Sequence, residues 1–208
     1  MKHVFGMLLL ICMVSSLFAA DIRAAMGLDM MGESYSAVEA MQVGIRNQVG
    51  LSLSGQAVKT QNNITYGFGI DFQLPRRHQS MPEGWNSSVT SAAYVPFYGH
   101  ISYNFPEYRS FAPMFIAQLG YSIPIYDYWE GDDDDYYDEE YKYEADGGIY
   151  TGFGIGMRHR DLDLQLLYKV NRSTLTEKEY IDGELDYSFH SDYNTRQWNL
   201  SIGYRFRN

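Results

Sequence analysis

The stretch "WNLSIGYRFRN", residues 198–208, alternates large apolar residues with small or polar ones. Every second position is apolar: Trp198, Leu200, Ile202, Tyr204 and Phe206. Because successive side chains of a β-strand point to opposite faces, this spacing predicts a strand with one apolar and one polar face.

The same alternation occurs seven more times along the chain. It is found in residues 22–31, 41–54, 64–73, 95–105, 115–123, 149–158 and 162–171. Eight such segments predict an all-β protein with an even number of strands.

The connections between these segments differ in length in a regular way. Short links at 59–63, 106–111 and 159–161 alternate with longer, polar links at 32–40, 75–92, 127–147 and 172–195. This order predicts an antiparallel up-and-down sheet, with tight turns at one end and long loops at the other.

The composition of the second face decides which side meets water. A solvated strand face carries many charged residues, yet here Gly, Ser, Gln and Asn dominate, as at Gly152, Gly154 and Gly156. In hydrocarbon a sheet must close to satisfy its edges, and strands of about 9–11 residues cross a bilayer. We therefore predict a transmembrane β-barrel whose apolar face contacts lipid.

The first twenty residues are typical of a secretory signal peptide. Lys2 precedes an apolar run at 4–14, and Ala19 and Ala20 end the segment. The run is short for the alternative, a membrane anchor. We expect a signal peptide at 1–20 and a barrel domain at 21–208.

The single cysteine lies in the removed segment, and a mature chain without disulfides suits a bacterial envelope.

The adjacent segments "VPFYGHISYNF" (95–105) and "APMFIAQLGYSIP" (112–124) form a strand pair of a known type. With the exported start and the eight alternating strands, the chain resembles the eight-stranded outer-membrane β-barrel family, of the OmpA-barrel and OmpX porin-like type. The resemblance implies a monomer among the outer-membrane lipids of a Gram-negative cell, with a structural or surface-interaction role through its extracellular loops. It also implies that the strand ending at Phe206 is read by the barrel-assembly machinery.

Charged residues on the second face predict a salt-bridged lumen. They are Arg23, Asp29, Arg46, Asp71, His100, Arg158, Asp163, Lys169 and Arg205. Buried charges are costly unless paired, and eight strands leave an interior that side chains can fill. The alternative is a small channel or transporter for ions or small solutes. No basic stripe is present, so nucleic acid is not an expected partner.

A third interpretation is a lipid-modifying enzyme. His100 and Ser102 share one face, but a hydrolase needs a third group to orient its histidine, and the next strand, 113–123, has no carboxylate. Both residues are also predicted to point inward, away from a lipid substrate. We therefore expect neither catalysis nor a cofactor.

The segment from Glu130 to Asp146 contains ten acidic residues, while the whole chain has a net charge of −10. Clustered carboxylates suit calcium, but runs of like charge are usually solvated. The segment is predicted to be a surface loop, with a divalent-cation site or an extracellular partner as alternatives.

Overall fold

The computed structural model describes residues 20–38, 41–76, 93–125, 129–131, 139–181 and 184–207. Except for Ala20, the expected signal peptide lies outside these ranges. Within the described ranges, the chain forms no helix long and apolar enough to cross a membrane.

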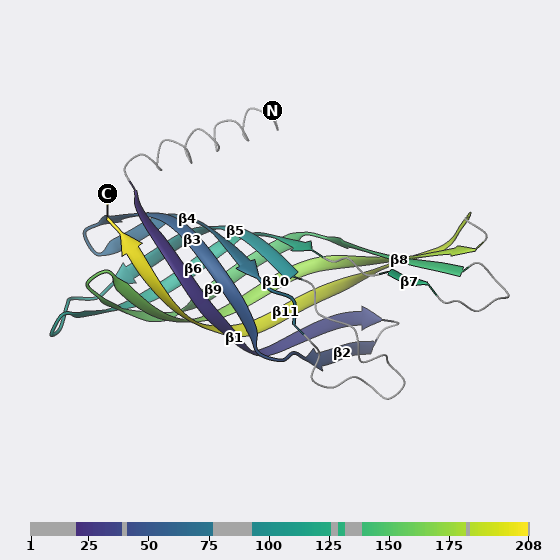
Figure 1. Cartoon of the computed structure of the whole chain (residues 1–208), viewed down its shortest axis with the longest axis horizontal. Helices are drawn as coiled ribbons and strands as arrows, with labels where there is room; N and C mark the ends of the chain where they lie inside the picture. The colour runs from purple at the N-terminus through teal and green to yellow at the C-terminus, as the bar shows by residue number, and fades with distance from the viewer. Residues whose placement is uncertain are drawn as a thin grey trace, which may run out of the picture.

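Eight strands form one closed wall (Figure 1). They are β1 (Asp21–Val38), β3 (Gly50–Gln61), β4 (Ile64–Gln73), β5 (Ala93–Asn104), β6 (Phe111–Ile125), β9 (Gly148–His159), β10 (Leu162–Ile181) and β11 (Glu184–Phe206). Each pairs antiparallel with the next in this order, and β11 pairs with both β10 and β1. The predicted eight-stranded antiparallel barrel is confirmed.

The seam between β11 and β1 closes the wall. Its register runs from Ile22 opposite Phe206 to Met30 opposite Trp198. The last strand of the chain is therefore paired with the first, over the two segments in which alternation predicts a strand. Both strands start or end at the same end of the barrel (Figure 1).

The two faces of the wall have opposite character. Apolar side chains are exposed on the outside, among them Met26, Leu53, Phe115, Ile155 and Ile202. Polar side chains fill the inside, where the cluster of buried apolar residues is limited to Met114, Ile116 and Leu167 among the described residues. A soluble protein buries its apolar face; this barrel presents it outward, as a lipid-facing wall requires.

Three short turns join the strands at one end, which we call the turn end. Asn62 and Arg160 adopt positive φ values of 54° and 55° in the β3–β4 and β9–β10 turns, and Arg109 and Ser110 do so between β5 and β6. Residues in this left-handed region reverse the chain within a few positions. The predicted short connections are confirmed.

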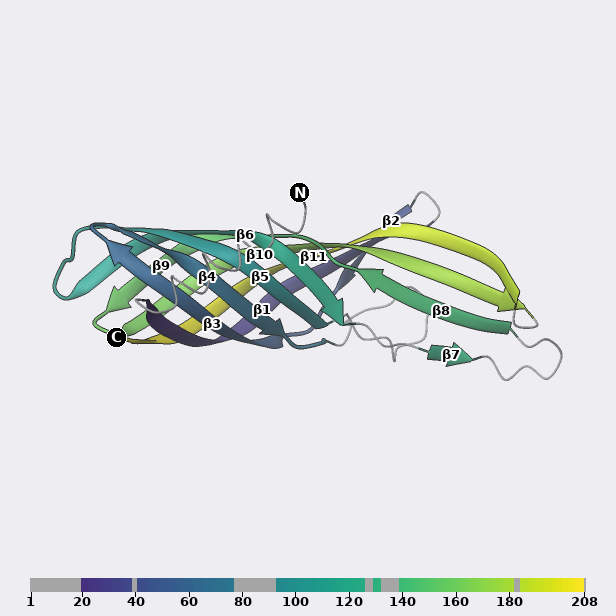
Figure 2. The ribbon, with the colours of Figure 1, turned by 90° about the horizontal axis from the view of Figure 1, so that it is seen from above.

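The opposite end, the hairpin end, differs from the prediction of long loops. The segments predicted as loops at 32–40, 127–147 and 172–195 contain strand: β1 continues to Val38, β7 (Trp129–Gly131) and β8 (Glu139–Asp146) lie in the second segment, and β10 and β11 extend into the third. β2 (Met41–Arg46) pairs with the end of β1. β10 and β11 stay paired as far as Ile181 and Glu184, so the hairpin projects far beyond the wall (Figure 2). The regular alternation of apolar and polar residues stops in the projecting part, while the pairing of β10 with β11 continues.

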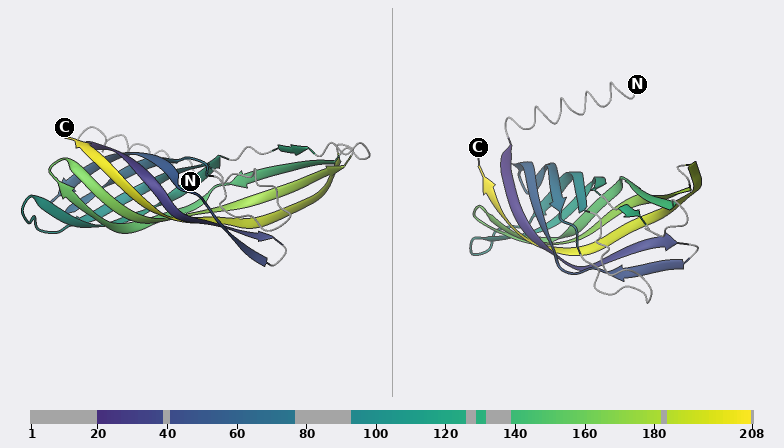
Figure 3. Two further views of the ribbon diagram at one scale, coloured as in Figure 1. Left: turned by 60° about the horizontal axis from the view of Figure 1, so that its bottom comes forward. Right: turned by 45° about the vertical axis from the view of Figure 1, so that its right-hand side comes forward.

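The strand predicted at 41–54 is divided into β2 and β3. β1 has a register shift between Met30 and Glu33, with Met31 at a φ of 49°. On the other side of the shift, the amide of Asn47 donates to the carbonyl of Gly32 at 2.7 Å. Beyond the shift β1 still pairs with β11 from Glu33 to Ser36. Past this pairing the β1–β2 and β10–β11 hairpins diverge (Figure 3), in keeping with the bend that bulges introduce.

Candidate functional site

The middle of the lumen is occupied by an ion pair and two tyrosines. Lys169 Nζ lies 2.7 Å from Asp71 Oδ2, and the Tyr98 hydroxyl donates to Asp71 Oδ1 at 2.7 Å. The rings of Tyr98 and Tyr150 lie 5.3 Å apart, and Tyr150 donates to Gln118 at 2.6 Å. These buried side chains lie on five strands, β4, β5, β6, β9 and β10, and meet in the barrel interior.

At the turn end, two arginines hold one carboxylate. Asp163 accepts from Arg23 Nε at 3.0 Å and from Arg158 Nε at 2.7 Å. Arg158 also donates to the side-chain oxygen of Asn104 at 3.2 Å. Because Asp163 is fully buried, each guanidinium offsets part of its desolvation cost.

A third arginine lies at the same end. Arg205 donates to Thr60 at 3.1 Å and lies 3.8 Å from the carboxylate of Asp21. Asp21 is the first residue of β1, and the predicted charged set did not include it.

At the hairpin end, Asp29 is paired with a residue that the sequence prediction missed. Arg76 Nη2 lies 3.2 Å from Asp29 Oδ2, and Asn199 donates to Asp29 Oδ1 at 2.7 Å. A Cβ atom at Gly32 would lie 2.8 Å from Arg76 Nη1, and one at Gly50 would also collide with this side chain. The two glycines make room for Arg76.

A layer of amides lies beside this pair. Gln73 Oε1 accepts from Asn171 at 2.9 Å and from Gln197 at 3.1 Å. Asn171 in turn accepts from Ser122 at 3.0 Å. These bonds link β4 with β10 and β11 through the lumen rather than round the wall.

The structure places eight of the nine predicted charged residues on the inner face, namely Arg23, Asp29, Asp71, His100, Arg158, Asp163, Lys169 and Arg205. For Arg46 the prediction is wrong, because this residue ends β2 in the projecting hairpin and its side chain is exposed. Arg76 takes the place of a lumen base instead. It follows Pro75 outside any alternating run, so period-two analysis could not find it; only the isolated pair of arginines after β4 hinted at it.

His100 and Ser102 are buried in the lumen, as predicted. Neither His100 Nδ1 nor Ser102 Oγ has a hydrogen-bond partner among the described residues. A histidine that activates a serine needs both a bond to it and an orienting group. In the described structure these two residues do not form such a dyad.

The acidic segment is described only in part. Residues 132–138 lie outside the described ranges, while 129–131 and 139–146 form β7, β8 and their pairing. The described residues contain no group of three or more His, Cys, Asp or Glu side chains placed to hold a metal ion. The divalent-cation site at Glu130 to Asp146 stays a prediction.

Solved structures of outer-membrane proteins share this fold. The outer membrane protein AlkL matches with a TM-score of 0.52 at 12% identity, covering 91% of each chain. OprG from Pseudomonas aeruginosa matches with a TM-score of 0.52 at 11% identity, over 91% of this chain and 97% of that one. The outer membrane protease OmpT from Escherichia coli matches at a TM-score of 0.46 and 12% identity, over 90% and 97%; this likeness is too distant to indicate activity. No protein-family model and no curated protein matches the chain.

At these identities the likeness concerns the fold alone. It agrees with three features of the chain itself: a closed order of eight antiparallel strands, an apolar outer wall and a polar inner face. The protein is an eight-stranded antiparallel β-barrel with the fold of outer-membrane proteins of known structure.

Proposed function

We propose that this protein is a non-conducting, non-catalytic barrel that presents a recognition surface on its projecting hairpins. The proposal rests on one observation above all: hydrogen bonds and ion pairs cross the lumen between strands on opposite sides of the wall. Lys169 on β10 reaches Asp71 on β4, and Asn171 on β10 reaches Gln73 on β4. A solute would have to break these buried bonds to pass.

The hairpins supply the surface. β10 and β11 contain 20 and 23 residues, whereas about 9–11 suffice to cross a bilayer. From Asn171 to Ile181, β10 adds roughly 30 Å of strand length at about 3.3 Å per residue. In barrels of this type the short turns face the periplasm and the longer connections face outward, so the hairpins would project from the cell.

Conductance in planar bilayers tests the closed lumen. We expect the full chain, inserted at a known protein-to-lipid ratio, to give no steady ohmic current, whereas a porin inserted in parallel gives one. A steady current from the wild-type protein would instead favour the small-solute channel.

The variant His100→Ala tests the enzyme alternative. A lipid-hydrolysing activity that is present in the wild-type protein and lost in this variant would support that alternative.

A shortened hairpin tests the recognition surface. Replacing 174–192 by an Asn-Gly turn keeps the wall while removing the projecting part of β10 and β11. We expect the variant to retain the heat-dependent gel shift of a folded barrel and to lose attachment of expressing cells to surfaces coated with extracellular-matrix proteins. Equal attachment by the shortened and full-length proteins would contradict a role for this hairpin.

A further inference from the structure

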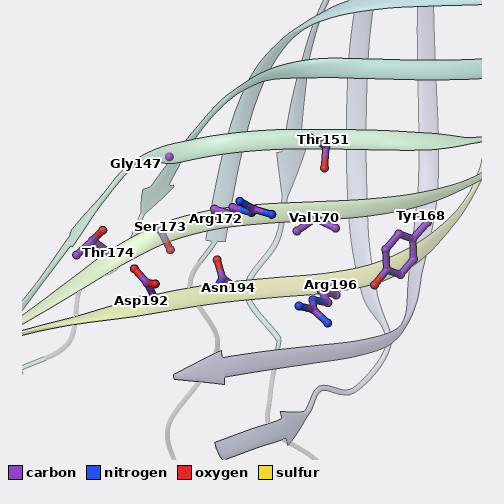
Figure 4. A pocket seen from close by; sticks show the side chains of 11 residues that line it. Gly147, Thr151, Tyr168, Val170, Arg172, Ser173, Thr174, Asp192, Asn194 and Arg196 are labelled. Carbon is purple, nitrogen blue, oxygen red and sulfur yellow. The ribbon is translucent and has the colours of Figure 1, made fainter. Parts of the chain in front are cut away.

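A groove lies on the outer surface of the barrel, over β9, β10 and β11 (Figure 4). Its volume is about 470 Å³. Arg172, Val170 and Tyr168 follow one another along β10, and Asn194 and Arg196 lie on β11 beside them. The intervening residues point inward: Asn171 and Thr195 are buried in the lumen. The lining side chains of β10 and β11 named here therefore belong to the outer face.

The groove begins where the apolar wall ends. One step toward the turn end, Tyr168 lies opposite Trp198 and opposite Phe153 in register. The Tyr168 ring is 5.2 Å from that of Trp198 and 5.4 Å from that of Phe153. Outward aromatic residues of a membrane barrel gather at the level of the lipid head groups. The groove is thus at head-group depth.

Two arginines line the groove. Arg172 lies opposite Asn194, and Arg196 lies opposite Val170, so the two arginines are diagonal neighbours on adjacent strands. Diagonal residues are about 7–8 Å apart at their backbones, within reach of long side chains. Planar guanidinium groups match phosphate oxygens well, so each arginine is suited to contact an anionic group.

We propose that this groove binds the phosphate of an anionic lipid in the leaflet around the hairpin end. The acyl chains would lie along the apolar wall below, against Trp198 and Phe153. Asp192 also lines the groove, but it is opposite Thr174, on the side of Arg172 away from the aromatic layer. Glu33 of β1 is opposite Arg196, so Arg172, which faces the neutral Asn194, is the principal anchor.

The position of the groove favours a lipid over a free phosphate ion. Its wall is continuous with lipid-facing side chains, and on β10 its edge toward the turn end is formed by Tyr168 and Val170 rather than by a third cation. A lipid gains binding free energy from contacts of both its phosphate and its acyl chains. Inorganic phosphate gains it only from the arginines, for which it competes with water. This inference does not depend on the recognition role proposed above.

Fluorescence of Trp198 provides a local probe. The chain has three tryptophans, so the Trp85→Phe, Trp129→Phe background leaves Trp198 alone, directly beside the groove. Reconstitution into phosphatidylcholine vesicles that contain brominated phosphatidic acid or brominated phosphatidylcholine gives the relative affinity of the two lipids from quenching. We expect stronger quenching by the brominated phosphatidic acid, and a preference about fivefold lower in Arg172→Gln, from the usual contribution of one arginine at an anionic surface.

Arg109→Gln is the matched control, because Arg109 is an exposed arginine at the turn end. It should leave the preference unchanged, Arg172→Lys should retain part of it, and the heat-dependent gel shift should show that each variant is folded. Equal quenching by the two lipids in the wild-type background would overturn the proposal, as would an equal loss in Arg109→Gln. Displacement of the lipid by inorganic phosphate, but not by chloride at the same ionic strength, would indicate a free-anion site instead.

Discussion

Lys169 and Asp71 form an ion pair across the barrel: Nζ of Lys169 lies 2.7 Å from Oδ2 of Asp71. Their strands, β10 and β4, stand opposite each other in the closed order of eight strands. Both side chains are buried, and Asp71 accepts a second bond from Tyr98. The pair therefore joins opposite walls of the barrel, which backbone pairing between neighbouring strands cannot do.

Lys169→Met should destabilise the barrel by about 3 kcal/mol, because it leaves the Asp71 carboxylate buried without its cation. The double variant Lys169→Met, Asp71→Asn should be more stable than the single one, since the amide oxygen can still accept from Tyr98. Urea unfolding in phospholipid vesicles, followed by tryptophan fluorescence, measures both. If the double variant unfolds at least as easily as Lys169→Met, the loss of stability in the single variant does not come from the unpaired Asp71 carboxylate.

Gly69→Ala should destabilise the barrel by about 1–3 kcal/mol through overpacking. A Cβ atom at Gly69 would lie 2.7 Å from the ring of Tyr98, which Asp71 and Gln56 hold by hydrogen bonds. Gly55→Ala is the control, because its Cβ would approach only Ile70, at 4.0 Å. The same urea titration compares them, and equal midpoints would contradict a fixed Tyr98 ring.

Asp163→Asn should also destabilise the barrel by about 3 kcal/mol, because it leaves Arg23 and Arg158 near each other without the carboxylate between them. Glu107→Gln removes an exposed carboxylate at the same end and should change stability by less than about 0.5 kcal/mol. The temperature of the gel-mobility transition gives a quick comparison. If both variants shift it alike, the lumen carboxylate has no special role.

Phe206→Ala should slow folding catalysed by the barrel-assembly machinery, if the closing strand is the signal it reads. Phe115→Ala is matched to it, since the two rings are similarly exposed, at 55% and 58%, and each has an aromatic neighbour. The rate of appearance of the folded gel band in proteoliposomes that contain the machinery measures the effect. A slowing by Phe115→Ala of the same size would mean that lost lipid contact, not recognition, is responsible.

The alternation of apolar and polar residues was sufficient to predict the wall. Each of the eight strands carries it because one face meets hydrocarbon and the other a polar lumen, so every second residue is constrained. The same constraint predicted which charged side chains point inward. Alternate residues of a strand lie on the same face, so placing one residue on the outer face places its neighbours in the sequence on the inner face. The inward position predicted for Arg46 was wrong because the strand is interrupted at Asn47, near the register shift in β1. The inner face of β3 therefore does not continue into β2.

The sequence by itself therefore determined the barrel class, its strand number and the polarity of its faces, because lipid imposes a local repeating pattern on each strand. Only the tertiary structure decided the partners inside the lumen, such as Asp29 with Arg76, whose positions differ by 47 residues. It also decided that β10 and β11 continue as a paired hairpin, where the alternation of apolar and polar residues no longer marks the strand. Pairing across a closed barrel depends on strand order and register, and no single segment contains that information.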